Sequence, residues 1–177
     1  MNSDKYQKRY IAHQKRKQKI LLTGKEEKPF YEHTVGEYIG AMKIISERRS
    51  RRVYGKEKIT PKELKLIKEF AGYAPSSCDR KAIKLVIDKK GIETLVGGRG
   101  WVEKADKVIK IYADMVAYKS PAEVNFMPYL DAGFVAQNIY LICEILNIKC
   151  CFINPNHTGT EIEKEGMRFC GAMALGK

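Results

Sequence analysis

The chain has 177 residues, of which 44% are hydrophobic and 10% aromatic, and this composition is typical of a folded domain rather than a disordered chain. Its net charge of +12 favours anionic partners such as nucleic acid, a membrane surface or a phosphorylated ligand, without choosing among them. No apolar run reaches the roughly 18 residues that a membrane span needs, so we expect no membrane insertion. The polar first residues predict no secretory signal, and we expect a cytoplasmic protein.

The cysteines and histidines give little support to metal or hydrolytic chemistry. The odd number of five cysteines indicates reduced thiols, and the vicinal pair Cys150-Cys151 is predicted to lie in a buried strand rather than to be redox-active. The three histidines are scattered along the chain, and none stands at metal-ligand spacing from another ligand residue. We therefore expect no metal site.

The start of the chain is strongly basic. Residues 1–28 carry nine Lys or Arg against three acids, and the segment Lys5–Ile20 has weak helical spacing. We predict a basic N-terminal arm over residues 1–33, made of a helix and a linker, and a folded domain over residues 34–177. The arm is either a solvated tail or an element that binds anions or clasps a dimer.

Two further helices precede the first strand. Apolar residues three and four apart predict a helix over Val35–Arg48. Residues 60–63, Thr-Pro-Lys-Glu, form a capping box with proline at the first helical position, which predicts the start of the next helix. Its buried face is predicted to hold Leu64, Ile67 and Ala71.

The second half of the chain alternates between strands and one long helix. Strands are predicted over residues 82–87, 107–112, 149–153 and 169–175. A helical pattern runs from Pro121 to Ile148, with an interruption expected near Pro128. Its residues from Phe134 onward are apolar nearly all round, as in a buried helix or a subunit interface. This mixture predicts an α+β or α/β sandwich around one central sheet.

Three polar stretches are candidates for a binding site. Arg48-Arg49-Ser50-Arg51-Arg52 follows a helix, and guanidinium groups pair with phosphate oxygens by two-point contacts. Residues 74–79, Ala-Pro-Ser-Ser-Cys-Asp, place small hydroxyl side chains on a loop where a ligand can approach closely. Residues 153–156, Ile-Asn-Pro-Asn, form a polar turn after a buried strand. Taken singly, each could equally be an exposed basic face or a plain turn.

Together these stretches resemble the nitroreductase family of flavoproteins. The family's pattern is Arg-Arg-Ser-x-Arg, then a capped helix, then Ala-Pro-Ser-Ser-x-Asn-x-Gln-Pro-Trp leading into a strand. The corresponding stretches here are residues 48–52, 60–73 and 74–83. Further along, three segments resemble the family's mid-domain strand entry, its long interface helix and its last core strand: residues 101–105, 131–141 and 171–176. The resemblance covers about residues 40–177.

The resemblance implies an α+β fold, namely a three-layer α/β/α sandwich with a central mixed, mainly antiparallel sheet, built as a homodimer. It implies flavin mononucleotide (FMN) at the subunit interface and NADH or NADPH as the reductant. Hydride would pass through flavin N5 to a small organic molecule, the electron acceptor. Because the cofactor carries this chemistry, no catalytic side chain is expected.

The resemblance also implies the residues that contact the cofactor. The basic cluster would hold the phosphate and ribityl chain, the proline-serine loop would approach the same flavin from the other subunit, and the turn after residue 153 would line the N5 and O4 edge. Two residues stand where the family has asparagine and glutamine, Asp79 and Lys81. The full set is Arg48, Arg49, Ser50, Arg52, Pro75, Ser76, Ser77, Asp79, Lys81 and Asn154.

Several departures from the family pattern leave alternatives open. Asp79 brings a negative charge that should lower the flavin potential unless Arg80 or Lys81 screens it. Pro155 lacks a backbone amide that the family often offers. The family usually continues past its last strand, and we expect the basic arm to substitute for part of that extension. The alternatives are an FMN-binding or sensing module without turnover, and a nucleic-acid-binding protein that acts through residues 1–28.

Overall fold

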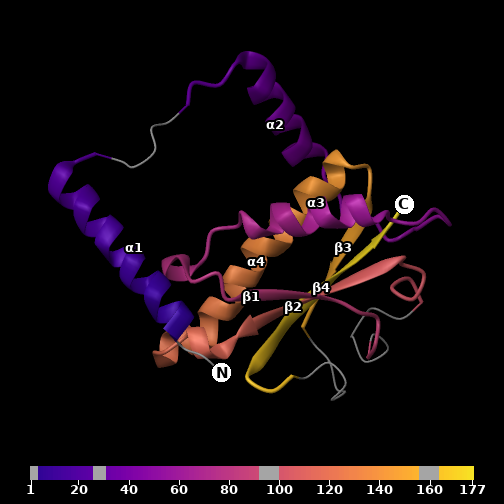
Figure 1. The fold of residues 1–177 in the computed structure, drawn as a ribbon. Coiled ribbons are helices and arrows are strands. Elements are labelled where there is room, and N and C mark those ends of the chain that lie inside the picture. The colour runs from indigo at the N-terminus through magenta and orange to yellow at the C-terminus, as the bar shows by residue number, and fades with distance from the viewer. Residues whose placement is uncertain (1–3, 26–30, 92–99, 156–163) are drawn as a thin grey trace.

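The fold is built on one antiparallel sheet. The computed structural model describes residues 4–25, 31–91, 100–155 and 164–177 (Figure 1). The four strands are β1 (Ile83–Ile87), β2 (Lys107–Asp114), β3 (Lys149–Ile153) and β4 (Met167–Gly176). Their order in the sheet is β1-β2-β4-β3, and each of these pairs is antiparallel. All four predicted strands are confirmed, and half of their eight ends are shifted by one or two residues.

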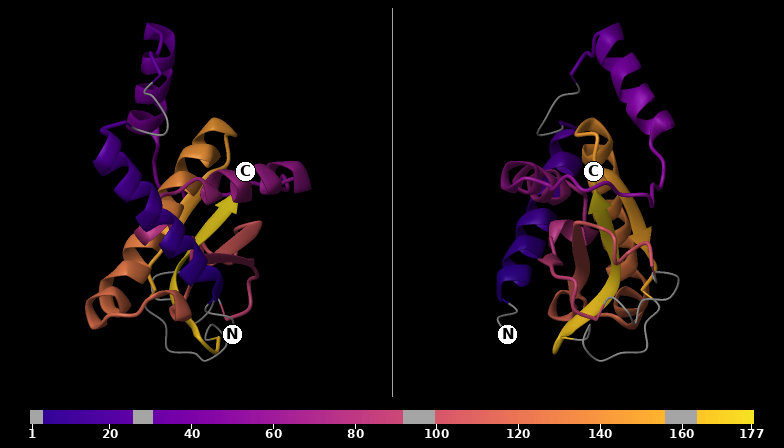
Figure 2. Two further views of the ribbon diagram at one scale, coloured as in Figure 1. Left: turned by 60° about the vertical axis from the view of Figure 1, so that its left-hand side comes forward. Right: turned by 90° about the vertical axis from the view of Figure 1, so that its right-hand side faces the viewer.

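Helices cover one face of this sheet. The two helices that pack there are α3 (Pro61–Gly72) and α4 (Pro121–Ile145), which cross each other over the strands (Figure 1). Two short 3₁₀ turns, η1 (Ser77–Asp79) and η3 (Met115–Ala117), flank the start of β1 and the end of β2. The helix α1 (Asp4–Thr23) lies against η1, whereas α2 (Val35–Glu47) projects beyond the sheet in all three views (Figures 1 and 2).

The alternation of side chains along the strands divides the core in two. On the helical face, Ile109 and Ile111 of β2 join the fully buried Ile67 of α3 and Ile139 of α4. On the opposite face, alanines and aromatic residues of β2 and β4 pack under non-helical segments. The residues of this second cluster include Tyr54, Trp101, Val102, Ala105, Val108, Tyr112, Phe169, Ala172 and Ala174. The α+β class predicted from the sequence is confirmed.

Capping boxes fix where three helices begin. The predicted box of α3 is present, because the Thr60 hydroxyl accepts from the Glu63 N–H and the Glu63 carboxylate accepts from the Thr60 N–H at 2.8 Å. Equivalent boxes start α2 at Thr34 and α4 at Ser120. Each box satisfies amides that have no partner inside the helix.

Contrary to the expected interruption, α4 runs straight through Pro128. Proline at this position removes the N–H that would donate to the carbonyl four residues earlier, that of Val124. The guanidinium of Arg168, on β4, donates to this carbonyl instead. The replacement donor comes from a residue 44 positions away, and this accounts for a continuous helix where local sequence predicts a break.

A bulge bends β4 where Gly171 stands. The register between β2 and β4 shifts between Ile111 and Tyr112, which leaves Cys170 without an opposite residue. Gly171 has a φ of +130°, and a Cβ atom there would lie 2.4 Å from the ring of Phe152. Glycine is therefore required both by its backbone conformation and by the ring packed against it.

The helix α1 is attached to the domain by a buried tyrosine. Tyr6 is 4% exposed, and its hydroxyl donates to the carboxylate of Asp114 at the end of β2, at 2.5 Å. Burial raises the pKa of the Tyr6 phenol, and the bond to Asp114 raises it further. The predicted basic helix is thus confirmed, but it is docked at its first turns rather than being a solvated tail.

Candidate functional site

The loop between α3 and β1 holds an unusual concentration of backbone strain. In the described parts of the chain, four non-glycine residues have a positive φ, and three of them are Cys78, Asp79 and Lys81, with φ of 50°, 53° and 53°. Such conformations cost on the order of 1 kcal/mol each and persist where surrounding contacts enforce them. They cluster at ligand-binding sites more often than elsewhere, which makes this loop a candidate site.

A buried aspartate fixes the start of this loop. The N–H of Ser77 donates to Oδ1 of Asp131 at 2.8 Å, and the hydroxyl of Tyr118 donates to Oδ2 at 2.9 Å. Asp131 lies on α4 and is 1% exposed. Its burial raises the pKa of the carboxyl, while the two hydrogen bonds oppose that rise. Asp131 therefore connects the loop rigidly to the long helix.

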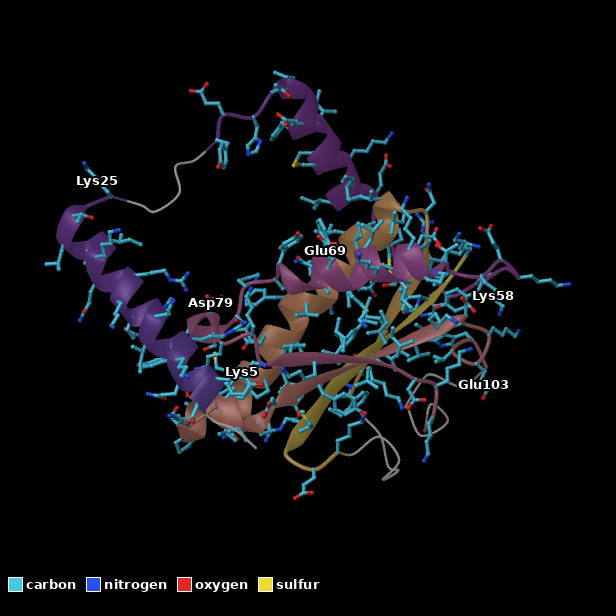
Figure 3. All side chains as sticks on the ribbon, in the orientation of Figure 1. Lys5, Lys25, Lys58, Glu69, Asp79 and Glu103 are labelled. Atoms are coloured by element: carbon cyan, nitrogen blue, oxygen red, sulfur yellow. The ribbon has the colours of Figure 1, made fainter. Side chains whose placement is uncertain are left out.

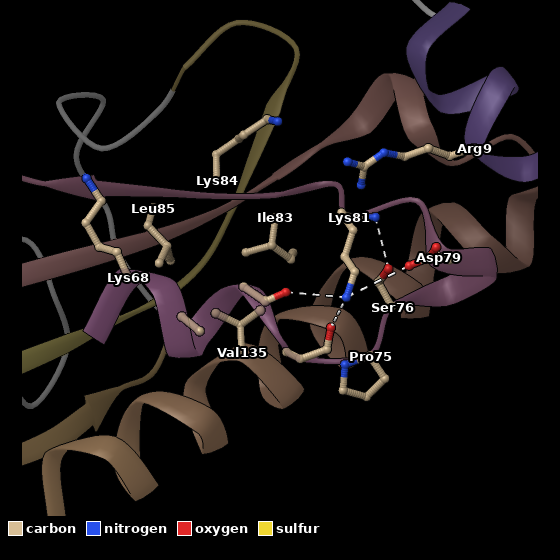
Figure 4. A pocket seen from close by; sticks show the side chains of 13 residues that line it. Arg9, Lys68, Pro75, Ser76, Asp79, Lys81, Ile83, Lys84, Leu85 and Val135 are labelled. Carbon is tan, nitrogen blue, oxygen red and sulfur yellow. Dashed lines mark hydrogen bonds and ion pairs between the residues drawn. The ribbon is translucent and has the colours of Figure 1, made fainter. Parts of the chain in front are cut away.

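Lys81 closes the other end of the loop. Its N–H donates to Oγ of Ser76 at 2.9 Å, and its ammonium donates to the carbonyls of Ala74 at 2.5 Å and Gly72 at 3.4 Å (Figure 4). These three bonds connect Lys81, at the end of the loop, to residues 72–76, at its start. The loop is a closed unit whose shape depends on Ser76 and Lys81.

The N-terminal helix supplies charge to the same loop. Arg16 pairs with Asp79 at 2.7 Å, Lys81 approaches the same carboxylate at 3.9 Å, and Figure 3 shows Asp79 facing α1. The bond from Arg16 is the main cause that holds the pKa of Asp79 below its usual value. Arg80 turns away and pairs with Glu123 at 2.9 Å. The screening of Asp79 therefore comes from Arg16, Lys81 and Arg9, whereas Arg80 is paired with Glu123.

A pocket of about 640 Å³ opens between this loop, α3 and β1 (Figure 4). Four of the residues predicted to bind a cofactor line it: Pro75, Ser76, Asp79 and Lys81. Its apolar wall combines β1 with the two helices, through Ala71, Ile83, Leu85 and Val135. The helix α1 contributes Arg9, which sequence analysis did not single out.

The basic cluster lies elsewhere, beside β3 and the second half of α4. The N–H of Arg51 donates to the carbonyl of Cys150 at 2.9 Å, so the cluster's backbone is attached to the edge strand. Oγ of Ser50 and the hydroxyl of Tyr140 are hydrogen bonded at 2.9 Å, and the N–H of Phe152 donates to the same hydroxyl at 2.7 Å. Tyr140 thus orients Ser50 against the sheet.

The guanidinium groups of this cluster spread over two aromatic rings. Arg48 lies over the ring of Tyr140 at 4.7 Å, and Arg52 lies over Trp101 at 5.5 Å. Arg49 donates to two backbone carbonyls of the preceding turn. Arg51 forms an ion pair of 3.3 Å with Glu144. Arg48 is half-buried and the other three arginines are exposed, so their guanidinium groups are available to an anion.

One protomer does not bring the three predicted stretches together. Tyr140, which holds the basic cluster, lies nine residues along α4 from Asp131, which holds the loop, a rise of about 14 Å at about 1.5 Å per residue. Asn154 is exposed at the end of β3, the opposite edge of the sheet from β1. With strands about 4.8 Å apart, three spacings separate these edges by about 14 Å. Pro155, the residue after Asn154, lines a second pocket of about 430 Å³. Asn156 lies outside the described residues.

Other kinds of site find no support in the described segments. Residues 4–25, 31–91, 100–155 and 164–177 contain no group of three or more His, Cys, Asp or Glu side chains placed to hold a metal ion. Across the same segments, no helix combines the length and apolar character needed to span a bilayer. Cys150 and Cys151 are both buried in β3 as free thiols, as the sequence predicted.

Comparison with known proteins agrees with the resemblance seen in the motifs. Residues 45–96 match the model of the nitroreductase family, a segment that spans both the basic cluster and the strained loop. The chain has the nitroreductase fold. A sequence search among curated proteins finds no match. Three similar solved structures are each less than 25% identical to this chain, so they establish its fold and nothing further.

Three solved structures illustrate the likeness. A protein assigned as a nitroreductase from Desulfovibrio desulfuricans, solved in complex with FMN, is 21% identical, with a TM-score of 0.63 over 76% of this chain and 84% of that one. A similar protein from Exiguobacterium sibiricum, also with FMN, is 20% identical, with a TM-score of 0.66 over 77% and 87%. A protein from Bacteroides thetaiotaomicron assigned as an NADH dehydrogenase or NAD(P)H nitroreductase is 19% identical, with a TM-score of 0.66 over 77% and 85%.

Proposed function

We propose that this chain is an FMN-dependent oxidoreductase of the nitroreductase type, active as a homodimer. The observation that carries the proposal is the fixed position of the basic cluster, in which Ser50 is held by Tyr140 and the Arg51 backbone by β3. The family match over residues 45–96 and the FMN in similar solved structures support it.

The donors present suit FMN in two separate parts. Residues 48–52 hold four arginines, and within the described parts of the chain Glu144 is the one acid that forms an ion pair with them. This excess of positive charge suits a phosphate dianion. The closed loop at Ser76 suits contact with the edge of a flat ring system. Since one protomer keeps these parts apart, we assign the phosphate to one subunit and the loop contacts to the other.

Each predicted residue has a role in the proposed cofactor site. The basic cluster holds the phosphate and ribityl chain, the proline-serine loop of the second subunit approaches the ring, and Asn154 lines its far edge. Asp79 stands near the ring with its charge offset by Arg16, so its effect on the flavin potential is smaller than an unpaired carboxylate would produce. The residues proposed are Arg48, Arg49, Ser50, Arg52, Pro75, Ser76, Ser77, Asp79, Lys81 and Asn154.

Exposed apolar helix faces support the dimer. On α2, five large apolar side chains are between 47% and 75% exposed, and α4 exposes several more along its length. Faces of this kind on a soluble domain mark contact with another protein surface. The residues concerned are Val35, Tyr38, Ile39, Met42 and Ile45 on α2 and Phe126, Tyr129, Leu130, Phe134 and Ile145 on α4.

The bound flavin would supply the redox chemistry, taking hydride from NADH or NADPH and reducing a small organic acceptor. The protein's part is to bind, orient and exclude water, and we assign no catalytic side chain. We also propose that residues 1–33 are an arm on a domain of residues 34–177, and that the protein works in the cytoplasm.

The colour of the purified protein tests the proposal. A yellow protein with flavin absorption bands is expected, and Arg49→Gln should weaken FMN binding about tenfold, whereas Lys56→Gln, an exposed charge change in the same region, should not. Protein that is colourless and takes up no added FMN would refute the assignment. Bleaching by NADH or NADPH under anaerobic conditions is the test of turnover.

A binding or sensing module without turnover is the second candidate. The ionised Asp79 favours it, because a carboxylate beside the ring disfavours the anionic reduced flavin. Such a module would be yellow and would not bleach with either nicotinamide, so the anaerobic titration separates the two functions.

A further inference from the structure

The pocket beside the strained loop combines an apolar wall with a charged rim. Ile83 and Leu85 of β1 point toward Val135 of α4 across the pocket, as Figure 4 shows. At one end of this wall stand Arg9 and Lys81, and Lys68 stands at the other. A site with this arrangement favours a molecule that has an apolar body and an anionic group.

The charges of the pocket are strongly unbalanced. Four cationic side chains line it, Arg9, Lys68, Lys81 and Lys84, against one acid, Asp79. That acid pairs with Arg16, a residue outside the lining, at 2.7 Å and lies 3.9 Å from Lys81. The charged form of Lys84 is disfavoured, because burial and then the nearby Lys5 lower the pKa of its ammonium. An anion entering the pocket would therefore relieve repulsion among cations held close together.

Two donors at the charged end have capacity left for a ligand. Within the described residues, the Arg9 guanidinium donates one hydrogen bond, to the Arg80 carbonyl at 3.4 Å, and a guanidinium has five N–H donors. The Ser76 hydroxyl accepts from the Lys81 N–H at 2.9 Å, which leaves its own proton for an acceptor. A carboxylate accepts from two such donors at once.

We propose that this pocket binds a small organic anion, an aromatic or similarly flat carboxylate, with Arg9 of the N-terminal helix as the residue that selects its charge. The carboxylate lies at the end formed by Arg9 and Ser76, and the apolar body lies against Ile83 and Leu85. Binding of the anion does not depend on the proposed function. Only the identification of this anion as the substrate class rests on the proposed function.

Two nitroaromatic probes that differ in charge test the chemistry of the ligand. Binding of 4-nitrobenzoate and of nitrobenzene to the full chain, with FMN present at saturation, is measured by calorimetry. The carboxylate should bind at least tenfold more tightly, and raising the salt concentration should narrow this difference. Acetate, which has the charge without the ring, should bind much more weakly than 4-nitrobenzoate.

Matched variants test whether Arg9 selects the charge of the ligand. Arg9→Gln should weaken binding of 4-nitrobenzoate about tenfold and leave nitrobenzene unchanged, and Arg9→Lys should restore part of the loss. The control is Lys8→Gln, which removes an equal charge from the neighbouring position of α1, outside the pocket lining, and should have little effect. Helical content and melting temperature of all three variants confirm that they fold.

Several results would overturn the proposal. These are equal affinity for the two nitroaromatic probes, an equal loss in Arg9→Gln and Lys8→Gln, and no binding of 4-nitrobenzoate when FMN is saturating. Failure of the proposed function looks different, because a colourless protein that binds no FMN can still bind 4-nitrobenzoate in an Arg9-dependent way. A yellow protein indifferent to the carboxylate would leave the flavin assignment intact and refute the anion site.

Discussion

Replacing Tyr6 by phenylalanine should release the N-terminal helix from the domain. The hydroxyl of Tyr6 is the buried link between α1 and the sheet, and its loss leaves the carboxylate of Asp114, 8% exposed, without this donor. A hydrogen bond to a charged group contributes about 1.5–3 kcal/mol. The remaining ties of α1, such as the ion pair of Arg16 with Asp79, whose side chains are 44% and 41% exposed, contribute roughly 0.2–1 kcal/mol each.

A loss of about 2 kcal/mol raises the undocked fraction of α1 about 30-fold, since about 1.4 kcal/mol is a factor of ten. Hydrogen exchange of the α1 amides and the rate of trypsin cleavage within α1 should both increase by this factor in Tyr6→Phe. Exchange in β4 should not change, because the core strands do not depend on α1 for their pairing. Tyr31→Phe is the control, because Tyr31 is 73% exposed. If α1 stays protected in Tyr6→Phe, the reasoning about this buried bond is wrong.

Three further substitutions probe the helices and the sheet. Hydrogen bonds and Lys177 depress the pKa of Glu63 to about 2, so the melting temperature of the wild type should exceed that of Glu63→Gln above about pH 5, with the difference disappearing as the pH falls to about 2. Gly171→Ala should lower stability by about 3 kcal/mol in urea unfolding, because its Cβ would meet a ring at 2.4 Å, whereas Gly72→Ala, with open space around it, should be near neutral. Arg168→Met should cost about 2 kcal/mol, and clearly less in a Pro128→Ala background, where the helix regains its own donor; equal costs would contradict the assigned bond.

The elements whose signals are local could be predicted from the sequence. The capping box at Thr60 fixed the start of α3, and continuous apolar runs located β3 at its observed bounds. The four strands follow from these periods. What failed was the expected break at Pro128, because the donor that rescues the helix comes from a strand distant in sequence.

The site was predicted less completely than the fold. The basic cluster and the loop were singled out because arginine forks and small hydroxyl residues stand in a recognisable order, and their contact with a cofactor stays a prediction. Asp131 and Tyr140 were missed as the residues that hold them, since their role depends on tertiary contacts to Ser77 and Ser50. Arg16 and Arg9 were hidden among many similar charges in the arm, and only the docking of α1 distinguishes them.

The bond between the Arg51 N–H and the Cys150 carbonyl has a consequence for how mutants of the basic cluster are interpreted. It belongs to the main chain, so it survives the removal of any guanidinium in the cluster. The course of the chain past β3 should stay the same when Arg49 or Arg52 is shortened. Substitutions there would therefore report the loss of charge and of donors separately from any change in the position of the main chain.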